Sequence, residues 1–156
     1  MLHVIIGRYP QRVRLWAILL IAVSVISTGC SQHVSGPAAT DPRLKSFKTF
    51  YLIHNDSDER GLSAIIQNEL AALGKEGRRG PPISTPANVD AIVTYYQDWR
   101  WDLTWYLLNL LIQFRDPETL VLLGSAVSHR TSLARTEPEA MTCEVLEAIL
   151  KCLAVQ

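Results

Sequence analysis

The chain has 156 residues, in which 15 basic and 15 acidic side chains give a formal net charge of zero. This balance excludes the basic footprint of a typical nucleic-acid-binding protein. The length suffices for one small domain with a single core. Three of the basic residues lie before residue 15, so 12 basic and 15 acidic residues remain in the rest of the chain. We therefore expect a slightly acidic domain and no nucleic-acid partner.

The first 29 residues have the layout of a bacterial secretory signal peptide. Three arginines precede an apolar run over residues 15–26, and small residues follow it up to Gly29. The apolar run is shorter than the ~20 residues of a membrane-spanning helix. The arginines favour a cytoplasmic position for this end, which sends the following chain outward. The pattern predicts a signal peptide over residues 1–29, with cleavage between Gly29 and Cys30.

Cys30 directly follows the small residues, in an arrangement that resembles a lipobox, where the cysteine is lipidated and becomes the mature N-terminus. A diacylglycerol and an N-acyl chain would supply the two or more alkyl chains that stable anchoring requires. Ser27 departs from the aliphatic residue usual at this position, so an ordinary secretory signal and an uncleaved N-terminal membrane helix stay open as alternatives. Ser31 stands where an aspartate often marks retention in the inner membrane. The resemblance thus implies a protein anchored in the outer membrane and facing the periplasm.

The segment after Cys30 is predicted to be a flexible tether. Residues 30–43 are rich in Ser, Gly, Pro and Ala and contain few apolar side chains. Such a composition gives a flexible linker that lifts a domain off a membrane surface. We expect one small α+β domain over residues 44–156.

Four segments of this domain show the alternation or the β-branched and aromatic content of strands. An Asp-Pro-Glu-Thr sequence at residues 116–119 is typical of a type I turn and favours a hairpin over a helix for the apolar segment before it. Gly124 is a candidate for a bulge or a close-packing point. The predicted strands cover residues 46–53, 91–101, 105–115 and 120–129.

Two segments have the apolar spacing of amphipathic helices. The first is predicted to begin at Asp56, with Glu59 completing a capping box, and to end at Gly74. Thr136 is the predicted cap of the second, which has Pro138 in its first turn. The stretch between, residues 74–89, is rich in Gly and Pro and predicts a long solvated loop, since its spacing does not match a phosphate-binding loop.

These elements predict an α+β fold with a four-stranded, mostly antiparallel sheet and two helices on one face, in the order β-α-β-β-β-α. Antiparallel sheets can leave one face exposed to water. The polar residues Asn109, Gln113 and Arg115 alternate along one strand and predict such a face.

Six of the chain's twelve aromatic residues lie within residues 95–106. Because alternate residues of a strand face opposite ways, these rings cannot all enter one core. They either pack at the end of the sheet or form a contact surface for an envelope protein, a glycan or the membrane beside the anchor. We expect at least one of the three tryptophans to be exposed. The predicted contact residues are Trp99, Trp101, Trp105 and Tyr106.

Nothing in the sequence predicts catalysis, a cofactor or a metal site. The histidines lack a nucleophile elbow. Cys143 and Cys152 are nine residues apart on one predicted helix, too far to form a disulfide there. A small periplasmic hydrolase stays open as the weaker alternative, and it would gather Asp98, Asp102 and His129 in one pocket.

Three stretches, KSFKTFYL, VDAIVTYYQDW and FRDPETLVLLGSAV, resemble a group of bacterial lipoproteins of uncharacterised function. The resemblance covers residues 44–152. It implies a small α+β domain behind a lipid anchor and carries no catalytic residue. We therefore expect a membrane-anchored, non-catalytic envelope lipoprotein that serves as a binding or assembly module in the periplasm.

Overall fold

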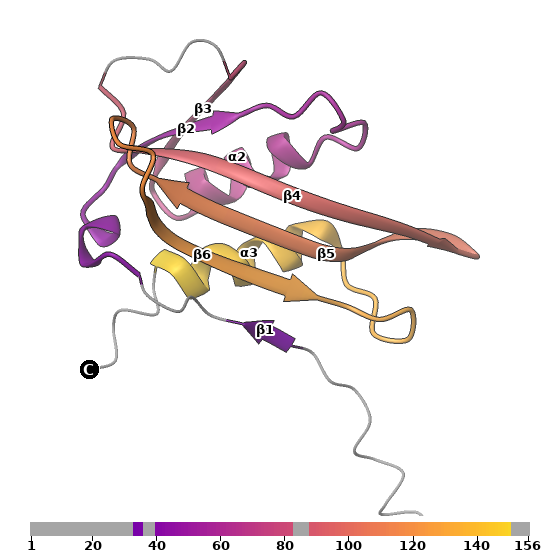
Figure 1. The fold of residues 1–156 in the computed structure, drawn as a ribbon. Helices are drawn as coiled ribbons and strands as arrows, with labels where there is room; N and C mark the ends of the chain where they lie inside the picture. Colours follow the sequence, from indigo (N-terminus) through magenta and orange to yellow (C-terminus); the bar gives the residue numbers. More distant parts are fainter. Residues whose placement is uncertain (1–32, 36–39, 83–87, 151–156) are drawn as a thin grey trace, which may run out of the picture. The chain divides into compact units, whose positions relative to one another are not determined.

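The computed structural model of the chain describes residues 33–35, 40–82 and 88–150 (Figure 1). The predicted signal peptide, the cleavage site at Gly29 and Cys30, and Cys152 lie outside the described residues. Within the described ranges, no helix has the length and apolar character needed to cross a membrane.

The domain is built on one mixed β-sheet with the strand order β1-β6-β5-β4-β2-β3. Strands β4, β5, β6 and the three-residue edge strand β1 pair antiparallel, whereas β2 is parallel to both of its neighbours. The predicted α+β class is thus confirmed, and three of the five strand pairings are antiparallel, but the sheet is mixed and has six strands where four were predicted. The strands are β1 (His33–Ser35), β2 (Thr49–Ile53), β3 (Glu76–Gly80), β4 (Ala91–Asp102), β5 (Thr104–Arg115) and β6 (Leu122–His129).

Strand β3 lies in the segment that was predicted to be a loop. It pairs with β2 along its whole length, from Glu76 opposite Thr49 to Gly80 opposite Ile53. The helix α2 (Leu62–Ala72) joins these two strands, because parallel neighbours need a crossover connection. Gly77 lies against the helix, where a Cβ would make an ordinary contact with the Leu70 side chain at 3.4 Å. The charged side chains of β3 are tolerated because β3 is an edge strand of the sheet.

The N-cap position of helix α2 is Gly61, and the side chain that caps the first N–H groups is Asp58. The capping-box spacing had predicted Asp56 for this role. The Asp58 carboxylate accepts hydrogen bonds from the N–H groups of Leu62 (2.8 Å) and Ser63 (2.7 Å). Gly61 adopts φ 71° immediately before the helix, and this left-handed residue moves the helix start to Leu62. At the other end the prediction is confirmed, because Gly74 has φ 72° and donates its N–H to Ala71.

Helix α3 (Pro138–Leu150) begins at the predicted proline, but Thr136 is not its cap. The first backbone hydrogen bond runs from Met141 to the carbonyl of Glu137. The hydroxyl of Thr136 instead accepts a hydrogen bond from Arg130 Nε at 3.0 Å. The apolar stripe of α3 is buried as expected; it includes Met141, Val145, Leu146 and Ile149.

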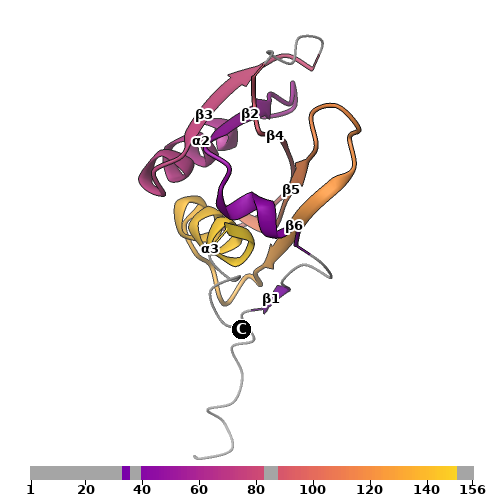
Figure 2. The ribbon, with the colours of Figure 1, turned by 90° about the vertical axis from the view of Figure 1, so that its left-hand side faces the viewer.

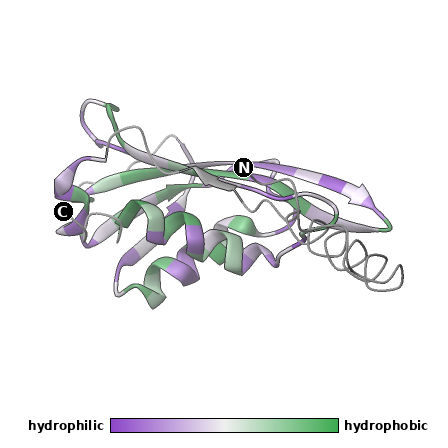
Figure 3. Ribbon diagram, turned by 90° about the horizontal axis from the view of Figure 1, so that it is seen from below, coloured by the Kyte–Doolittle hydropathy of each residue, from purple (hydrophilic) through white to green (hydrophobic). Residues whose placement is uncertain are grey.

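Both helices lie on one face of the sheet (Figure 2), and Figure 3 shows the same two layers coloured by hydropathy. Apolar residues of both helices belong to the buried core. Between them and the strands lies the core, in which Phe50 and Phe114 meet edge to face with centroids 5.3 Å apart. Gly124 packs closely, as predicted, because a Cβ there would be 3.0 Å from Leu44. The opposite face of the sheet carries Gln113 and other polar residues that stay partly accessible to water.

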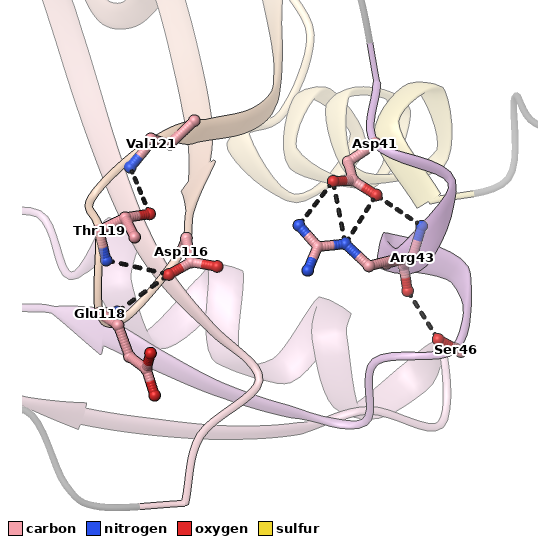
Figure 4. A network of polar contacts seen from close by, with 7 residues as sticks. All are labelled: Asp41, Arg43, Ser46, Asp116, Glu118, Thr119 and Val121. Atoms are coloured by element: carbon pink, nitrogen blue, oxygen red, sulfur yellow. Dashed lines mark hydrogen bonds and ion pairs between the residues drawn. The ribbon is translucent and has the colours of Figure 1, made fainter.

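Two aspartates, Asp41 and Asp116, stabilise chain segments outside the sheet through hydrogen bonds (Figure 4). Asp41 caps the short 3-10 helix η2 (Pro42–Lys45), and hydrogen bonds from Arg43 hold the pKa of Asp41 below its usual range. Asp116 occupies the β5–β6 turn, where it accepts hydrogen bonds from Thr119 and Glu118 at 3.0 Å, and these bonds lower its pKa. Strand β1 and the start of η2 fall within residues 30–43.

Candidate partner-binding surface

Strands β4 and β5 extend beyond the rest of the sheet as a two-stranded ribbon. In the described part of the chain, residues 99–102 and 104–107 pair only with each other, past the ends of β2 and β6 (Figure 1). A bulge falls where the ribbon begins, since Asp98 pairs with Asn109 but Trp99 pairs with Leu107. The bulge turns Leu107 into the core, where it is 1% exposed.

The end of the ribbon presents large apolar side chains to solvent. Trp101 is 64% exposed, Trp105 is 53% exposed, and Leu103 at the turn is 85% exposed with φ 63°. Trp99 is partly buried against the core. The predicted exposure of at least one tryptophan is confirmed, and the contact with a partner stays a prediction. We call this surface the hairpin tip; it consists of Trp99, Trp101, Leu103, Trp105 and Tyr106.

An arginine from the loop before α2 braces one side of the hairpin tip. The guanidinium of Arg60 lies 4.9 Å from the ring centroid of Trp99 and 4.4 Å from that of Trp105. Cations at this distance are attracted to the faces of indole rings. Arg60 therefore holds two of the rings in place without covering Trp101.

A second arginine, Arg135 in the loop before α3, braces the same ribbon. Its guanidinium lies 4.8 Å from the ring centroid of Tyr106 and donates hydrogen bonds to the Thr104 hydroxyl (2.5 Å) and the Asp102 carbonyl (2.6 Å). It also forms an ion pair with the Asp102 carboxylate at 3.1 Å. The tip is thus held by two loops, which lowers the conformational freedom that its residues would lose on binding.

The loop that carries Arg135 is itself fixed by a buried arginine. Arg130 is fully buried, forms an ion pair with Glu144 on α3, and donates hydrogen bonds to Thr136 and to the His129 carbonyl. The N–H of Arg130 donates to the carbonyl of Leu108, the residue left unpaired by the bulge. Sequence reasoning missed this role, because an arginine in a linker after a strand has no pattern that distinguishes a buried position from a solvated one.

The residues of the hydrolase alternative are not brought together. Asn109 lies between Asp98 and His129 on the open face of the sheet: its amide donates to Asp98 at 3.4 Å, and its oxygen is 2.7 Å from His129 Nδ1. Asp102 lies at the end of β4, where it accepts a hydrogen bond from Arg135. Among the described residues, no group of three or more His, Cys, Asp or Glu side chains could hold a metal ion.

A second polar cluster lies at the start of α2, where the Tyr95 hydroxyl donates to Asp58 at 2.9 Å. Burial raises the pKa of Tyr95 to about 12. Burial also raises the pKa of Asp58, but the hydrogen bonds from Ser63 and Leu62 outweigh it, so this pKa lies below its usual value. His54 is 3.4 Å from the Ser63 hydroxyl, yet Ser63 is only 1% exposed. This arrangement caps a helix and offers no accessible nucleophile.

A hollow of about 470 Å³ lies beside this cluster and is lined by His54, Asp56, Gln67 and Arg79. The hydroxyl of Ser63 and the carboxylate of Asp58 do not line it. The hollow therefore does not combine with the cluster into a catalytic arrangement.

Comparison with known proteins finds likeness at the level of the fold. No protein-family model matches the sequence, and no curated protein does. The fold is similar to that of PelC. A structure of a singly substituted PelC dodecamer from Paraburkholderia phytofirmans is 16% identical, with 77% of this chain and 98% of that chain covered and a TM-score of 0.58. A second PelC dodecamer from the same organism is 16% identical, with 77% and 97% covered and a TM-score of 0.55. At such identity the likeness to PelC concerns the fold alone.

Proposed function

We propose that this chain is a lipid-anchored protein of the bacterial cell envelope and that its domain is a non-catalytic assembly module. Residues 1–29 direct export, Cys30 carries the lipid, and the domain faces the periplasm from the outer membrane. The layout of the first thirty residues supports the anchor. The fold likeness to PelC, whose structures are described as dodecamers, supports assembly from several copies of the chain.

The observation that carries the non-catalytic part of the proposal is the hairpin tip. A monomeric soluble protein rarely presents clustered large apolar side chains to water without a partner for them. Trp101, Leu103 and Trp105 are exposed together, while Arg60 and Arg135 keep the ribbon in one conformation. Tryptophan, tyrosine and arginine are also the residues that most often dominate binding energy in interfaces. A contact surface accounts for this cluster better than an active site does.

The anchor is tested by mass spectrometry of the N-terminal peptide and by fractionation of the expressing cells. We expect a mature chain that starts at an acylated Cys30 and a protein that sediments with outer membranes. Cys30→Ala should release the domain from the membrane fraction. Cys143→Ala, which changes a half-buried cysteine on α3, is the matched control and should leave the protein in the membranes. An unmodified Cys30 in the mature protein would contradict the anchor.

Assembly is tested separately, by native mass spectrometry of the detergent-solubilised, lipidated protein. We expect a closed homo-oligomer, since most soluble homo-oligomers have closed point-group symmetry. A monomer across the micromolar concentration range would refute assembly and leave the anchor intact.

A further inference from the structure

We propose that the partner of the hairpin tip is the lipid bilayer that holds the anchor, with Trp101, Leu103 and Trp105 inserted in its interfacial layer. This inference rests on the proposed function, because it takes the lipid on Cys30 as the point of attachment. It identifies what covers the exposed rings.

The strand register shows at which end of the sheet the anchored chain enters. His33, the first residue of β1, is opposite His129, which in turn is opposite Asn109 of β5. From this row β1 runs away from the hairpin tip, since Ser35 is opposite Val127 (Figure 1). Strand β1 therefore begins at the end of the sheet from which the tip projects.

The covalent reach of the chain limits how far the tip can be from the membrane. Cys30 is three residues before His33, so its Cα lies within ~11 Å of that of His33, at ~3.6 Å per residue. Asp98 of β4 is opposite Asn109, and Leu103 is five residues beyond Asp98, which corresponds to ~16 Å at ~3.3 Å per residue. The tip thus extends past the row at His33 by more than the chain to Cys30 can span. In an orientation with the strands along the membrane normal and the tip toward the bilayer, an acylated Cys30 at the bilayer surface brings the tip to the same depth or deeper.

The chemistry of the hairpin tip fits the interfacial layer. Tryptophan has an apolar ring with one polar N–H and is enriched where hydrocarbon meets headgroups. Leu103 at the apex has no polar atom in its side chain and is 85% exposed. Arg60 and Arg135 lie over the rings of Trp105 and Tyr106, and guanidinium groups beside an inserted tip can pair with lipid phosphates.

Two alternatives fit less well. A second copy of the chain as the occupant would need about 20–30 residues per side for a stable interface, whereas the ribbon offers only a narrow end. The other exposed apolar cluster, Leu120, Val121 and Leu122, contains no tryptophan. It also lies at the opposite end of β5 and β6, where Arg115 pairs with Leu122, away from the chain that leads to Cys30.

The experiment uses the mature lipoprotein in vesicles of phosphatidylethanolamine and phosphatidylglycerol whose acyl chains are brominated near the headgroup. Bromine quenches only the tryptophans that reach the bilayer. Trp99→Phe with Trp105→Phe leaves Trp101 as the reporter. The matched control adds Trp101→Phe and Tyr96→Trp, which moves the reporter five residues along β4 to a position of similar exposure, since Tyr96 is 59% exposed.

We expect most of the Trp101 emission to be lost, with a blue shift of its maximum, and little loss from the reporter at position 96. The wild-type protein gives a second measurement that needs no substitution, and its emission should be quenched in part. Quenching of neither the wild-type protein nor Trp101, in protein whose acylated Cys30 is verified by mass, overturns this inference and leaves the anchor standing. An unacylated Cys30 instead overturns the proposed function and removes the geometric basis of the inference. Equal quenching at positions 96 and 101 overturns it too, because the domain would then lie flat.

Discussion

Replacing Asp58 by alanine should destabilise the domain far more than replacing Asp56, although both aspartates lie in the loop before α2. Asp58 accepts hydrogen bonds from the N–H groups of Leu62 and Ser63 and from the Tyr95 hydroxyl. Asp58→Ala leaves all three donors without this acceptor in a buried site. Asp56 is exposed and does not cap the helix, so Asp56→Ala is the matched control.

The expected loss follows from these three contacts. Removing an N-cap side chain costs about 0.5–2 kcal/mol, and a buried hydroxyl left without a partner costs about 1–3 kcal/mol. We therefore expect Asp58→Ala to lower the free energy of unfolding by about 2–4 kcal/mol, a large part of the 5–15 kcal/mol typical of a domain. Asp56→Ala should stay within about 0.5 kcal/mol of the wild type.

Urea unfolding at pH 7, followed by far-ultraviolet circular dichroism, measures both free energies. Equal losses in the two variants, or a loss below about 0.5 kcal/mol for Asp58→Ala, would refute the assignment of the cap. The pH dependence gives an independent check, because the pKa of folded Asp58 lies below the ordinary value of 3.8. Its contribution is therefore present above pH 3.8 and is lost as the pH falls through the lower pKa of the folded state. The difference between wild type and Asp58→Ala should shrink in that range.

Three further predictions concern stability and are measured by chemical denaturation. Arg130→Ala should cost about 1–3 kcal/mol, because it removes a fully buried guanidinium that donates hydrogen bonds to Thr136 and to the His129 carbonyl and pairs with the partly exposed Glu144. A cost like that of an exposed arginine would contradict its burial. Gly124→Ala should cost about 1–3 kcal/mol, since the added methyl group would press on Leu44, and an unchanged midpoint would show that the core yields there. The pKa of Tyr95 is raised from 10.0 to about 12 in the folded state. The neutral hydroxyl therefore contributes about 2–3 kcal/mol to the free energy of unfolding below pH 10, and this contribution is lost as the pH rises to 12. Tyr95→Phe should make the free energy of unfolding less dependent on pH in this range, and an unchanged alkaline slope would refute the role of Tyr95.

The elements with strong periodicity could be predicted from the sequence. The spacing of apolar residues gave both helices, and alternation gave β4, which was expected over residues 91–101 and spans Ala91–Asp102. The apolar segment that became β5 was ambiguous between helix and strand. The turn chemistry of Asp116 and Pro117 resolved it, because a hairpin needs strands on both sides of its turn. Local patterns were sufficient wherever one element carried the signal by itself.

Strand β3 could not be found this way, because its sequence, Glu-Gly-Arg-Arg-Gly, has no apolar alternation and little strand propensity. It is a strand because backbone groups of β2 pair with it and because its glycines permit close neighbours. A Cβ at Gly80 would be 2.3 Å from the Tyr51 hydroxyl. One indirect signal existed: a helix that follows a strand commonly returns the chain to a parallel neighbour. That rule places a strand after α2 even where the composition predicts a loop.

The cap of α2 was missed by two residues for a similar reason. Asp56 and Glu59 have the spacing of a capping box, and the sequence offers Asp58 as an equally suitable residue type. The choice depends on Gly61, whose left-handed conformation delays the helix, and on Tyr95, which lies 37 residues away and donates to Asp58. Such long-range contacts have no local signature.

At the hairpin tip the alternation of residues along the strand does not determine which side chains are buried. Val93 and Tyr95 are buried, and Trp101 belongs to the same alternation along β4 but is 64% exposed. The bulge keeps Leu107 and Trp105 on this same side of β5, so the apolar face of the sheet continues along the ribbon. Arg60 covers part of this face, over Trp99 and Trp105, and leaves Trp101 exposed. A strand pair with a core-like face and no covering layer implies a covering from outside the domain, and the entry of the anchored chain at the same end favours the membrane in that role.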